Sequence, residues 1–212
     1  MGRKIYTDHN GKTRIGEIEL FLEIAIEQAS SAIRFSDEQS ELLTYEHEVY
    51  DPFSNKMITL KGWGHLDRLF FIDSERTKNE IQGITALSTF YEALINEIAI
   101  TELGSTYFKK HLDKLTHLSK WEIVLQLVYG RSLDNSKEYF EHLKKLVEAR
   151  NQLVHYRTKT PEGENQINQL KILVNGLKSF LILLEDLRQL DTEKGIIKFT
   201  IPTKYLERIG EL

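Results

Sequence analysis

Helix-breaking residues are scarce in this chain, and this scarcity limits its possible folds more than any other feature. The 212 residues include three prolines and twelve glycines, while 41% of the chain is hydrophobic. Proline interrupts a helix because it lacks the backbone N–H and clashes with the preceding turn, and glycine weakens a helix. We therefore expect long helices, packed as one large domain or as one domain with an extension.

Apolar residues recur at helical spacing along most of the chain, and this spacing predicts where the helices lie. The expected helices cover residues 17–34, 38–48, 78–103, 107–118, 120–129, 136–156 and 160–190. Gly104 and Gly130 follow two of them and predict where those helices end. Thr160-Pro161, followed by acidic residues, predicts the start of the last helix.

Two short segments have the character of strands. KMITL (56–60) lies within a stretch from about residue 51 to 76 that is otherwise expected to be irregular, and GIIKFTI (195–201) alternates apolar residues with others. An isolated strand leaves its backbone groups without partners, so we expect these two segments to pair. The sequence thus predicts a mainly α fold with a small two-stranded β element.

We expect the chain to have three parts. Residues 77–191 form an up-and-down helical bundle, and residues 1–76 form an N-terminal helical extension that packs on it. Residues 192–212 form a C-terminal tail with a short strand. No internal repeat or low-complexity segment interrupts this division.

Composition excludes several classes of protein. Lys and Arg total 28 and Asp and Glu total 32, which gives a formal net charge of −4. A protein that coats nucleic acid is usually basic, so contact with nucleic acid is expected to be local. The chain has no cysteine, which excludes disulfides, thiol nucleophiles and metal sites with cysteine ligands.

Signals for membranes, metals and nucleotides are missing from the sequence. The N-terminal segment lacks the apolar core of a secretory signal, and no stretch approaches about 18 uninterrupted apolar residues. The seven histidines are scattered, and the pair His111 and His117 has no third ligand at a suitable spacing. No glycine-rich phosphate loop is present. We expect a cytoplasmic protein that has no metal, no cofactor and no membrane contact.

Arg150 lies in the middle of an apolar stripe. On a helical wheel, six apolar or aromatic residues lie within about 60° of it. These residues are Tyr139, Leu143, Leu146, Val147, Leu153 and Val154. Because an unpaired buried guanidinium costs several kcal/mol, Arg150 needs an acidic partner or a cavity. A structural ion pair inside a helical dimer is the simplest explanation, and a functional site is the alternative.

A narrow polar strip on the helix at 78–103 contains a candidate partner for Arg150. Glu92 and Asn96 are four residues apart and share this strip with Thr85 and Thr89. Since the rest of the helix is mostly apolar, the strip can face the interior of the bundle or a cleft. Glu92 is the candidate partner, and an ordinary solvated glutamate is the alternative.

His155 follows Arg150 by five residues, at roughly 140° around a straight helix. The two side chains therefore do not share a face of a regular helix. A π-bulge would bring them together within one chain, and a two-fold axis would bring them together across two chains. A histidine that stabilises the end of a helix is the simpler interpretation of His155 alone.

The pattern Arg-Asn-x-x-x-His, written here as RNQLVH, resembles the signature of the HEPN superfamily. The preceding FYEALINEIAITEL resembles the long helix that lies before the motif in many HEPN proteins. The segment that leads from HLSKWEIVLQLVYG to VEARNQLVHYR is similar to theirs as well. The resemblance covers residues 78 to 190, about half of the chain, and implies a HEPN-like helical bundle.

The resemblance also implies a function. Many HEPN proteins are homodimers in which two motifs face one cleft, and many are metal-independent endoribonucleases of toxin–antitoxin or antiviral systems. The implied partners are RNA and an antitoxin or nucleotidyltransferase protein. Other members are inactive and bind RNA, a nucleotide or a protein, and the acidic composition keeps this alternative open. Arg150 and His155 match the two signature positions, and Asn151 matches the polar position between them.

These residue types suit RNA cleavage without a metal. RNA carries its own nucleophile, the 2′-hydroxyl, and a histidine with a pKa near 6.5 can move protons near neutral pH. A guanidinium can stabilise the charge that develops on the phosphate. Asn151, Glu92 and Asn96 are candidates to orient these groups. Arg157 and Lys159 are candidates to contact RNA phosphates, although a solvated helix end explains them equally well.

Overall fold

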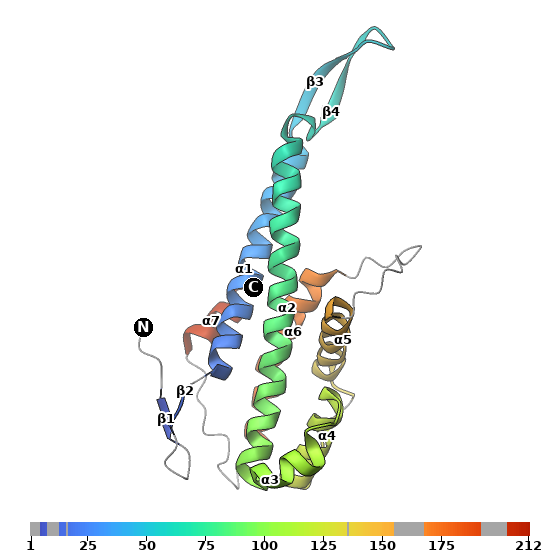
Figure 1. The fold of residues 1–212 in the computed structure, drawn as a ribbon. Helices are drawn as coiled ribbons and strands as arrows, with labels where there is room; N and C mark the ends of the chain where they lie inside the picture. Colours follow the sequence, from blue (N-terminus) through green and yellow to red (C-terminus); the bar gives the residue numbers. More distant parts are fainter. Residues whose placement is uncertain (1–4, 8–12, 16, 135, 155–167, 192–202) are drawn as a thin grey trace.

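The computed structural model describes residues 5–7, 13–15, 17–134, 136–154, 168–191 and 203–212 (Figure 1). Within these ranges the predicted mainly α fold is confirmed. The helices are α1 (Glu17–Thr44), α2 (Leu66–Leu103), α3 (Ser105–Tyr107), α4 (His117–Tyr129), α5 (Glu138–Val154), α6 (Gln169–Leu190) and α7 (Thr203–Gly210). The strands form two antiparallel pairs, β1 (Ile5–Thr7) with β2 (Thr13–Ile15) and β3 (Glu46–Asp51) with β4 (Lys56–Lys61).

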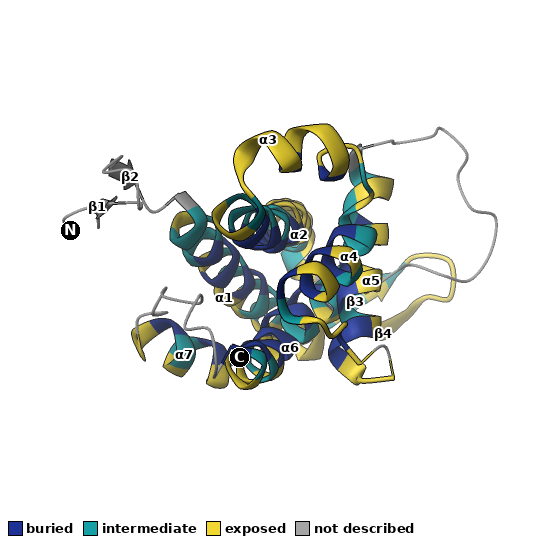
Figure 2. Cartoon of the chain, turned by 90° about the horizontal axis from the view of Figure 1, so that it is seen from below, coloured by how far each residue is buried: buried dark blue, intermediate teal, exposed yellow. Residues whose placement is uncertain are grey.

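Helix α2 is the centre of the bundle, because it packs against α1, α4, α5 and α6. The buried faces of these helices point toward one another (Figure 2). Large side chains fill the space between them: the rings of Phe90 and Phe180 meet edge to face with centroids 4.8 Å apart, and Trp121 is fully buried. The Tyr91 hydroxyl donates a hydrogen bond to the Gly176 carbonyl at 2.9 Å.

Close packing between helices depends on a glycine of α2. A Cβ atom at Gly83 would lie 2.4 Å from Leu173 on α6 and 3.2 Å from Gln28 on α1. Such contacts are far inside van der Waals distance, so a larger residue here would force the helices apart. The requirement explains a glycine in the interior of a long helix, where it otherwise weakens the helix.

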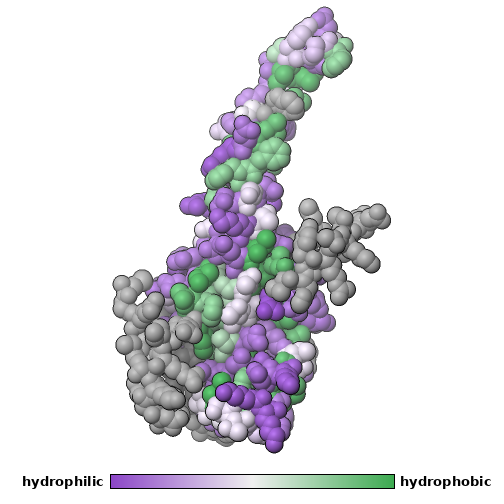
Figure 3. All heavy atoms as spheres, viewed as in Figure 1, coloured by the Kyte–Doolittle hydropathy of each residue, from purple (hydrophilic) through white to green (hydrophobic). Residues whose placement is uncertain are grey.

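The end of α1 and the start of α2 leave the bundle together and are capped by the β3–β4 hairpin (Figure 1). We call residues 35–78 the arm. In the hairpin, Glu46 pairs with Lys61 and Asp51 pairs with Lys56 in the strand register. Hydrophobic residues appear at the surface along this arm (Figure 3). They include Phe53, which is 98% exposed, and Phe70, which is 72% exposed.

The prediction for the arm was wrong in two places. No second helix covers 38–48, because α1 continues to Thr44 and a strand begins at Glu46. Ser36 does not cap a new helix, since neither Pro nor Gly interrupts α1 there. The expected irregular stretch is instead a hairpin followed by α2, whose first residue is Leu66 and not Lys78.

A turn at residues 51–55 explains the hairpin. The carboxylate of Asp51 accepts hydrogen bonds from the backbone N–H groups of Phe53 and Ser54, at 3.0 and 3.2 Å. Asn55 adopts the left-handed conformation, with φ of 55°, which asparagine tolerates better than most residues. The KMITL segment is a strand as predicted, and it pairs with β3. Its expected pairing with the tail stays a prediction. Residues 195–201 lie outside the described residues.

The predictions for helix ends had mixed outcomes. Gly104 and Gly130 end α2 and α4 as predicted. The expected helix at 107–118 is wrong, because α3 is followed by a single π-helical segment, Phe108–Leu112. Helix α4 begins three residues earlier than expected, because Thr116 accepts a hydrogen bond from the Ser119 N–H and caps it.

Other expected features fall partly outside the described residues. Helix α5 is described to Val154, and the expected start at Thr160-Pro161 lies in the range 155–167.

Helix α2 crosses the expected boundary between residues 76 and 77 without a break, and α1 shares the core with it through Leu22 and Ile26. None of the described helices is both long and apolar enough to cross a membrane.

Candidate functional site

Helix α5 presents Arg150 at the border of the core. Leu143 and Leu146 are buried on the same face, as the apolar stripe predicts. Arg150 itself is half-buried, and its Nη1 donates a hydrogen bond to Oδ1 of the exposed Asn151 at 3.2 Å. Among the described residues no ion pair of Arg150 is found. The guanidinium is therefore at the surface end of the stripe and is not sealed in an internal pair.

The buried cation of this region is Lys120 on α4. Its side chain is 4% exposed, and its Nζ lies 3.2 Å from Oε1 of Glu92 on α2. The ammonium also lies over the ring of Phe108, 5.6 Å from the ring centroid. A buried ammonium needs such partners because desolvation strongly disfavours it. The expected partner of Arg150 thus pairs with a different cation: Lys120 is buried and faces α2, whereas Arg150 reaches solvent.

His117 begins α4, one turn before Lys120, so the two side chains share a face of that helix. Its Nε2 is sealed from solvent and has no hydrogen-bond partner among the described residues. Burial lowers the pKa of His117 to about 4, against an opposing effect of Glu92. The positive charges of Lys120 and Arg150 contribute to this lowering of the pKa. The imidazole is therefore neutral at pH 7.

The other residues of the predicted polar strip on α2 are of two kinds. Thr85 and Thr89 donate their hydroxyls to carbonyls of the preceding turn, both at 2.8 Å, so they satisfy themselves within the helix. Asn96 lies one turn after Glu92, and its Oδ1 is sealed without a partner among the described residues. Within the predicted strip, Glu92 and Asn96 are therefore the residues whose polar groups are not satisfied by their own helix.

We call this set the polar cluster: Glu92 and Asn96 of α2, His117 and Lys120 of α4, and Arg150 of α5. The helices that carry it pack against one another in pairs, α2 with α4, α2 with α5 and α4 with α5. The cluster contains an ammonium group, a guanidinium group and one carboxylate. It can therefore bind an anion or hold a proton on the imidazole when a negative charge comes close.

Three predicted site residues, His155, Arg157 and Lys159, lie outside the described residues. Their positions relative to Arg150, and any convergence within a chain or across a dimer, stay predictions. Of the seven predicted site residues, the structure describes Arg150, Asn151, Glu92 and Asn96.

Sequence reasoning missed Lys120 and considered His117 only as a possible metal ligand with His111. His111 is exposed and its ring lies 4.8 Å from that of Tyr107, away from any third ligand. No group of three or more potential metal ligands occurs in the part of the chain that the structure describes. The sequence signal for these two residues is the same as for Arg150, a polar residue within an apolar stripe. His117 and Lys120 interrupt the buried stripe of α4 at helical spacing.

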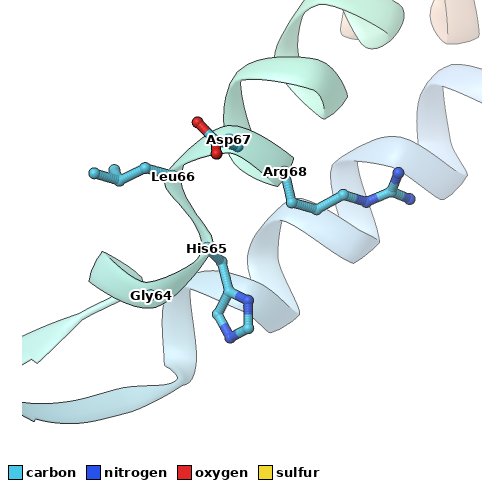
Figure 4. A pocket seen from close by; sticks show the side chains of 5 residues that line it. All are labelled: Gly64, His65, Leu66, Asp67 and Arg68. Atoms are coloured by element: carbon cyan, nitrogen blue, oxygen red, sulfur yellow. The ribbon is translucent and has the colours of Figure 1, made fainter.

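A hollow at the base of the β3–β4 hairpin is a weaker candidate. It is lined by five consecutive residues, Gly64 to Arg68. The side chains of His65, Leu66 and Arg68 point away from one another, so they offer no convergent groups to a ligand (Figure 4). We therefore place the candidate site at the polar cluster.

Comparison of the chain with protein-family models, with curated proteins and with solved structures gave no match. The class of protein that the fold defines is a helical bundle with an extended arm. The HEPN resemblance rests on the RNQLVH motif and its surrounding segments.

Proposed function

We propose that the chain is a metal-independent endoribonuclease of HEPN type that acts as a homodimer. The observation that supports this proposal best is the state of Arg150. Its guanidinium reaches the surface and, among the described residues, is bonded to the Asn151 amide and to no carboxylate. A guanidinium in this state keeps most of its donors for a phosphate group.

In this proposal the RNA 2′-hydroxyl attacks the neighbouring phosphate. Arg150 stabilises the added negative charge, and Asn151 orients the phosphate by hydrogen bonding. His155 of one chain removes the 2′-hydroxyl proton, and His155 of the second chain protonates the leaving 5′-oxygen. Arg157 and Lys159 bind neighbouring phosphates. The proposed setting is the cytoplasm, in toxin–antitoxin or antiviral defence with an antitoxin or nucleotidyltransferase partner.

Cleavage of mixed RNAs in the presence of a chelator tests this function. We expect Arg150→Ala and His155→Ala each to reduce the rate by about 10²- to 10⁴-fold. Arg131→Ala and His111→Ala are matched controls, because both residues are exposed and lie outside the polar cluster. Equal cleavage by the wild type and both site variants would show that the activity belongs to a contaminant.

The arm favours a second candidate function, a catalytically inactive module that binds RNA, a nucleotide or a protein partner. Phe53 and Phe70 are largely exposed on it, and large exposed apolar side chains commonly mark binding surfaces. RNA binding without cleavage in the same assay, with a loss of binding in Arg150→Ala, would support this alternative.

A further inference from the structure

The polar cluster leaves a buried cation with few acceptors. An ammonium group has three N–H donors, whereas Lys120 is 3% exposed and contacts one carboxylate oxygen and one aromatic ring among the described residues. Lys120 also lies in the first turn of α4, where the helix dipole adds partial positive charge. Together with Arg150, the cluster presents more positive charge than the single carboxylate of Glu92 neutralises.

The two members of the ion pair differ in their access to water. The Lys120 side chain is 4% exposed and the Glu92 side chain is 40% exposed. Glu92 can therefore rotate into solvent, where its charge is well hydrated, while Lys120 cannot leave the interior. Any anion that reaches this position meets a fixed cation whose present partner is replaceable.

We propose that Lys120, His117 and Arg150 bind one phosphate group, and that the Glu92 carboxylate occupies this position until the phosphate displaces it. The proposal deepens the proposed function, on which it rests for the source of the phosphate, a phosphodiester of RNA. The polar atoms available to the ligand come from α4 and α5, and Glu92 of α2 moves aside.

The imidazole of His117 responds to such a ligand. It is neutral in the free protein, and its Nε2 is sealed without a partner among the described residues. The groups that act on it are Glu92 from α2, Lys120 from its own helix, Arg150 from α5 and the Tyr91 backbone. A dianionic probe such as sulfate adds more negative charge than the displaced Glu92 carboxylate takes away, so it raises the pKa of His117 and favours proton uptake. A phosphodiester is a monoanion and replaces the charge of the carboxylate without adding to it.

The deciding experiment measures the affinity of the full chain for inorganic phosphate by calorimetry at pH 7. We expect Glu92→Gln to bind phosphate about tenfold more tightly, because the competing charge is lost while an acceptor for Lys120 remains. Lys120→Gln is expected to bind at least about tenfold more weakly. Asp186→Asn is the matched control: Asp186 pairs with Lys137 at 2.6 Å outside the cluster, and its removal is expected to leave affinity unchanged.

The phosphate affinity of Glu92→Gln decides whether the proposal fails. If Glu92 and Lys120 form only a structural ion pair, Glu92→Gln binds phosphate no better than the wild type or than Asp186→Asn. Should Lys120→Gln fail to fold, Glu92→Gln still gives this answer, because it removes no buried cation. A histidine NMR titration with sulfate, which remains a dianion between pH 5 and 8, supplies a second readout: the His117 ring is expected to titrate at higher pH with sulfate than without it.

A 2′-deoxy oligonucleotide, which has no attacking hydroxyl, identifies the source of the phosphate. Competition between this oligonucleotide and inorganic phosphate supports a nucleic-acid phosphodiester as the ligand. Phosphate binding without such competition supports the site but assigns it to a small phosphate compound. Because none of these measurements needs cleavage, they separate a failure of the phosphate site from a failure of the ribonuclease proposal.

Discussion

The arm and the bundle are built from the same two helices, α1 and α2, yet they are stabilised differently. In the bundle, α2 is surrounded by other helices and buries Phe90, Tyr91 and Leu94. In the arm, among the described α-helices, the same helix is accompanied by α1 alone, and it exposes Phe70 and Phe71. The comparison teaches that the number of neighbouring elements, more than helix composition, decides whether an apolar side chain is buried.

Contacts between α1 and α2 in the arm include several polar ones. Nε of Arg68 donates to Glu38 at 2.6 Å, and Nη1 of Arg76 donates to Gln39 at 2.6 Å. The Arg68–Glu38 ion pair is exposed, and an exposed ion pair contributes about 0–1 kcal/mol. The arm also has nine acidic and five basic residues between 35 and 78. We therefore expect it to contribute less to global stability than the bundle.

The largest difference is expected between two aromatic substitutions. Trp121→Ala removes a fully buried side chain from the bundle and is expected to lower the free energy of unfolding by about 3–5 kcal/mol. Phe70→Ala removes a side chain of the arm that is 72% exposed and is expected to change it by about 0.5 kcal/mol or less. Urea unfolding followed by circular dichroism measures both, and equal losses would refute the contrast.

The second effect is a loss of stability in acid that originates in the bundle. An unfolded histidine binds a proton near pH 6.5, whereas His117 in the folded protein does so only near pH 4. As the pH falls from 6.5 to 4, the unfolded state binds more protons, so the free energy of unfolding decreases. The contribution of His117 is fully present above pH 6.5 and amounts to about 3 kcal/mol.

His117→Gln isolates this contribution. The difference in unfolding free energy between wild type and variant, measured in urea at several pH values, cancels the groups common to both proteins. Glu80 is one of these, since burial raises its pKa and gives the opposite dependence on pH. A difference that is constant between pH 7 and pH 4 would show that His117 is not buried in its neutral form.

Two glycine substitutions compare steric tolerance in the two regions. A Cβ at Gly83 would lie 2.4 Å from buried Leu173 in the bundle, and a Cβ at Gly64 would lie 2.8 Å from the His47 ring in the arm. We expect Gly83→Ala to lose about 1–2 kcal/mol, because overpacking outweighs the gain of alanine in a helix. Gly64→Ala is expected to lose about 0.5 kcal/mol or less, because the close atoms belong to the end of a side chain that can rotate, and not to the backbone. Thermal unfolding ranks the two, and a reversed order would contradict the difference in packing.

Removal of the whole hairpin is also expected to have only a small effect on the bundle. The N–H of Gly62 donates to the carbonyl of Tyr45 at 2.8 Å, so a short linker can replace residues 46–61. We expect the free energy of unfolding of the bundle to change by about 1 kcal/mol or less, because no residue of the hairpin belongs to the described core. The Trp63→Phe background leaves Trp121 as the fluorescent reporter of the bundle. A loss of several kcal/mol would show that the arm and the bundle unfold as one unit.

The same contrast explains which parts of the fold the sequence predicts. Stripes such as Leu143 and Leu146 on α5 arise because the bundle buries one face of each helix, and their spacing was recognised correctly. At the start of α2 the apolar residues Leu66, Phe70 and Phe71 are exposed and do not form one buried face. The sequence pattern therefore did not predict a helix there. The hairpin was missed because the hydrogen bonds of Asp51 and the left-handed Asn55 are local features without a periodic pattern.

The candidate site was predicted only in part. Arg150 and Glu92 were recognised because each is a polar residue in an apolar helical pattern. The Lys120–Glu92 pair depends on how α2 and α4 pack, and residues 28 positions apart in the chain give no local sign of that contact. The sequence indicates for His117 only its spacing to another histidine, whereas the groups around it come from three different helices.

The uninterrupted length of α2 makes distant parts of the molecule members of one element. From Leu66, where the helix leaves the hairpin, to Glu92 in the polar cluster, the axis runs about 39 Å. No loop separates the junction with the hairpin from the carboxylate that faces Lys120. A molecule that binds at the start of α2 would therefore contact the same continuous helix that carries this carboxylate.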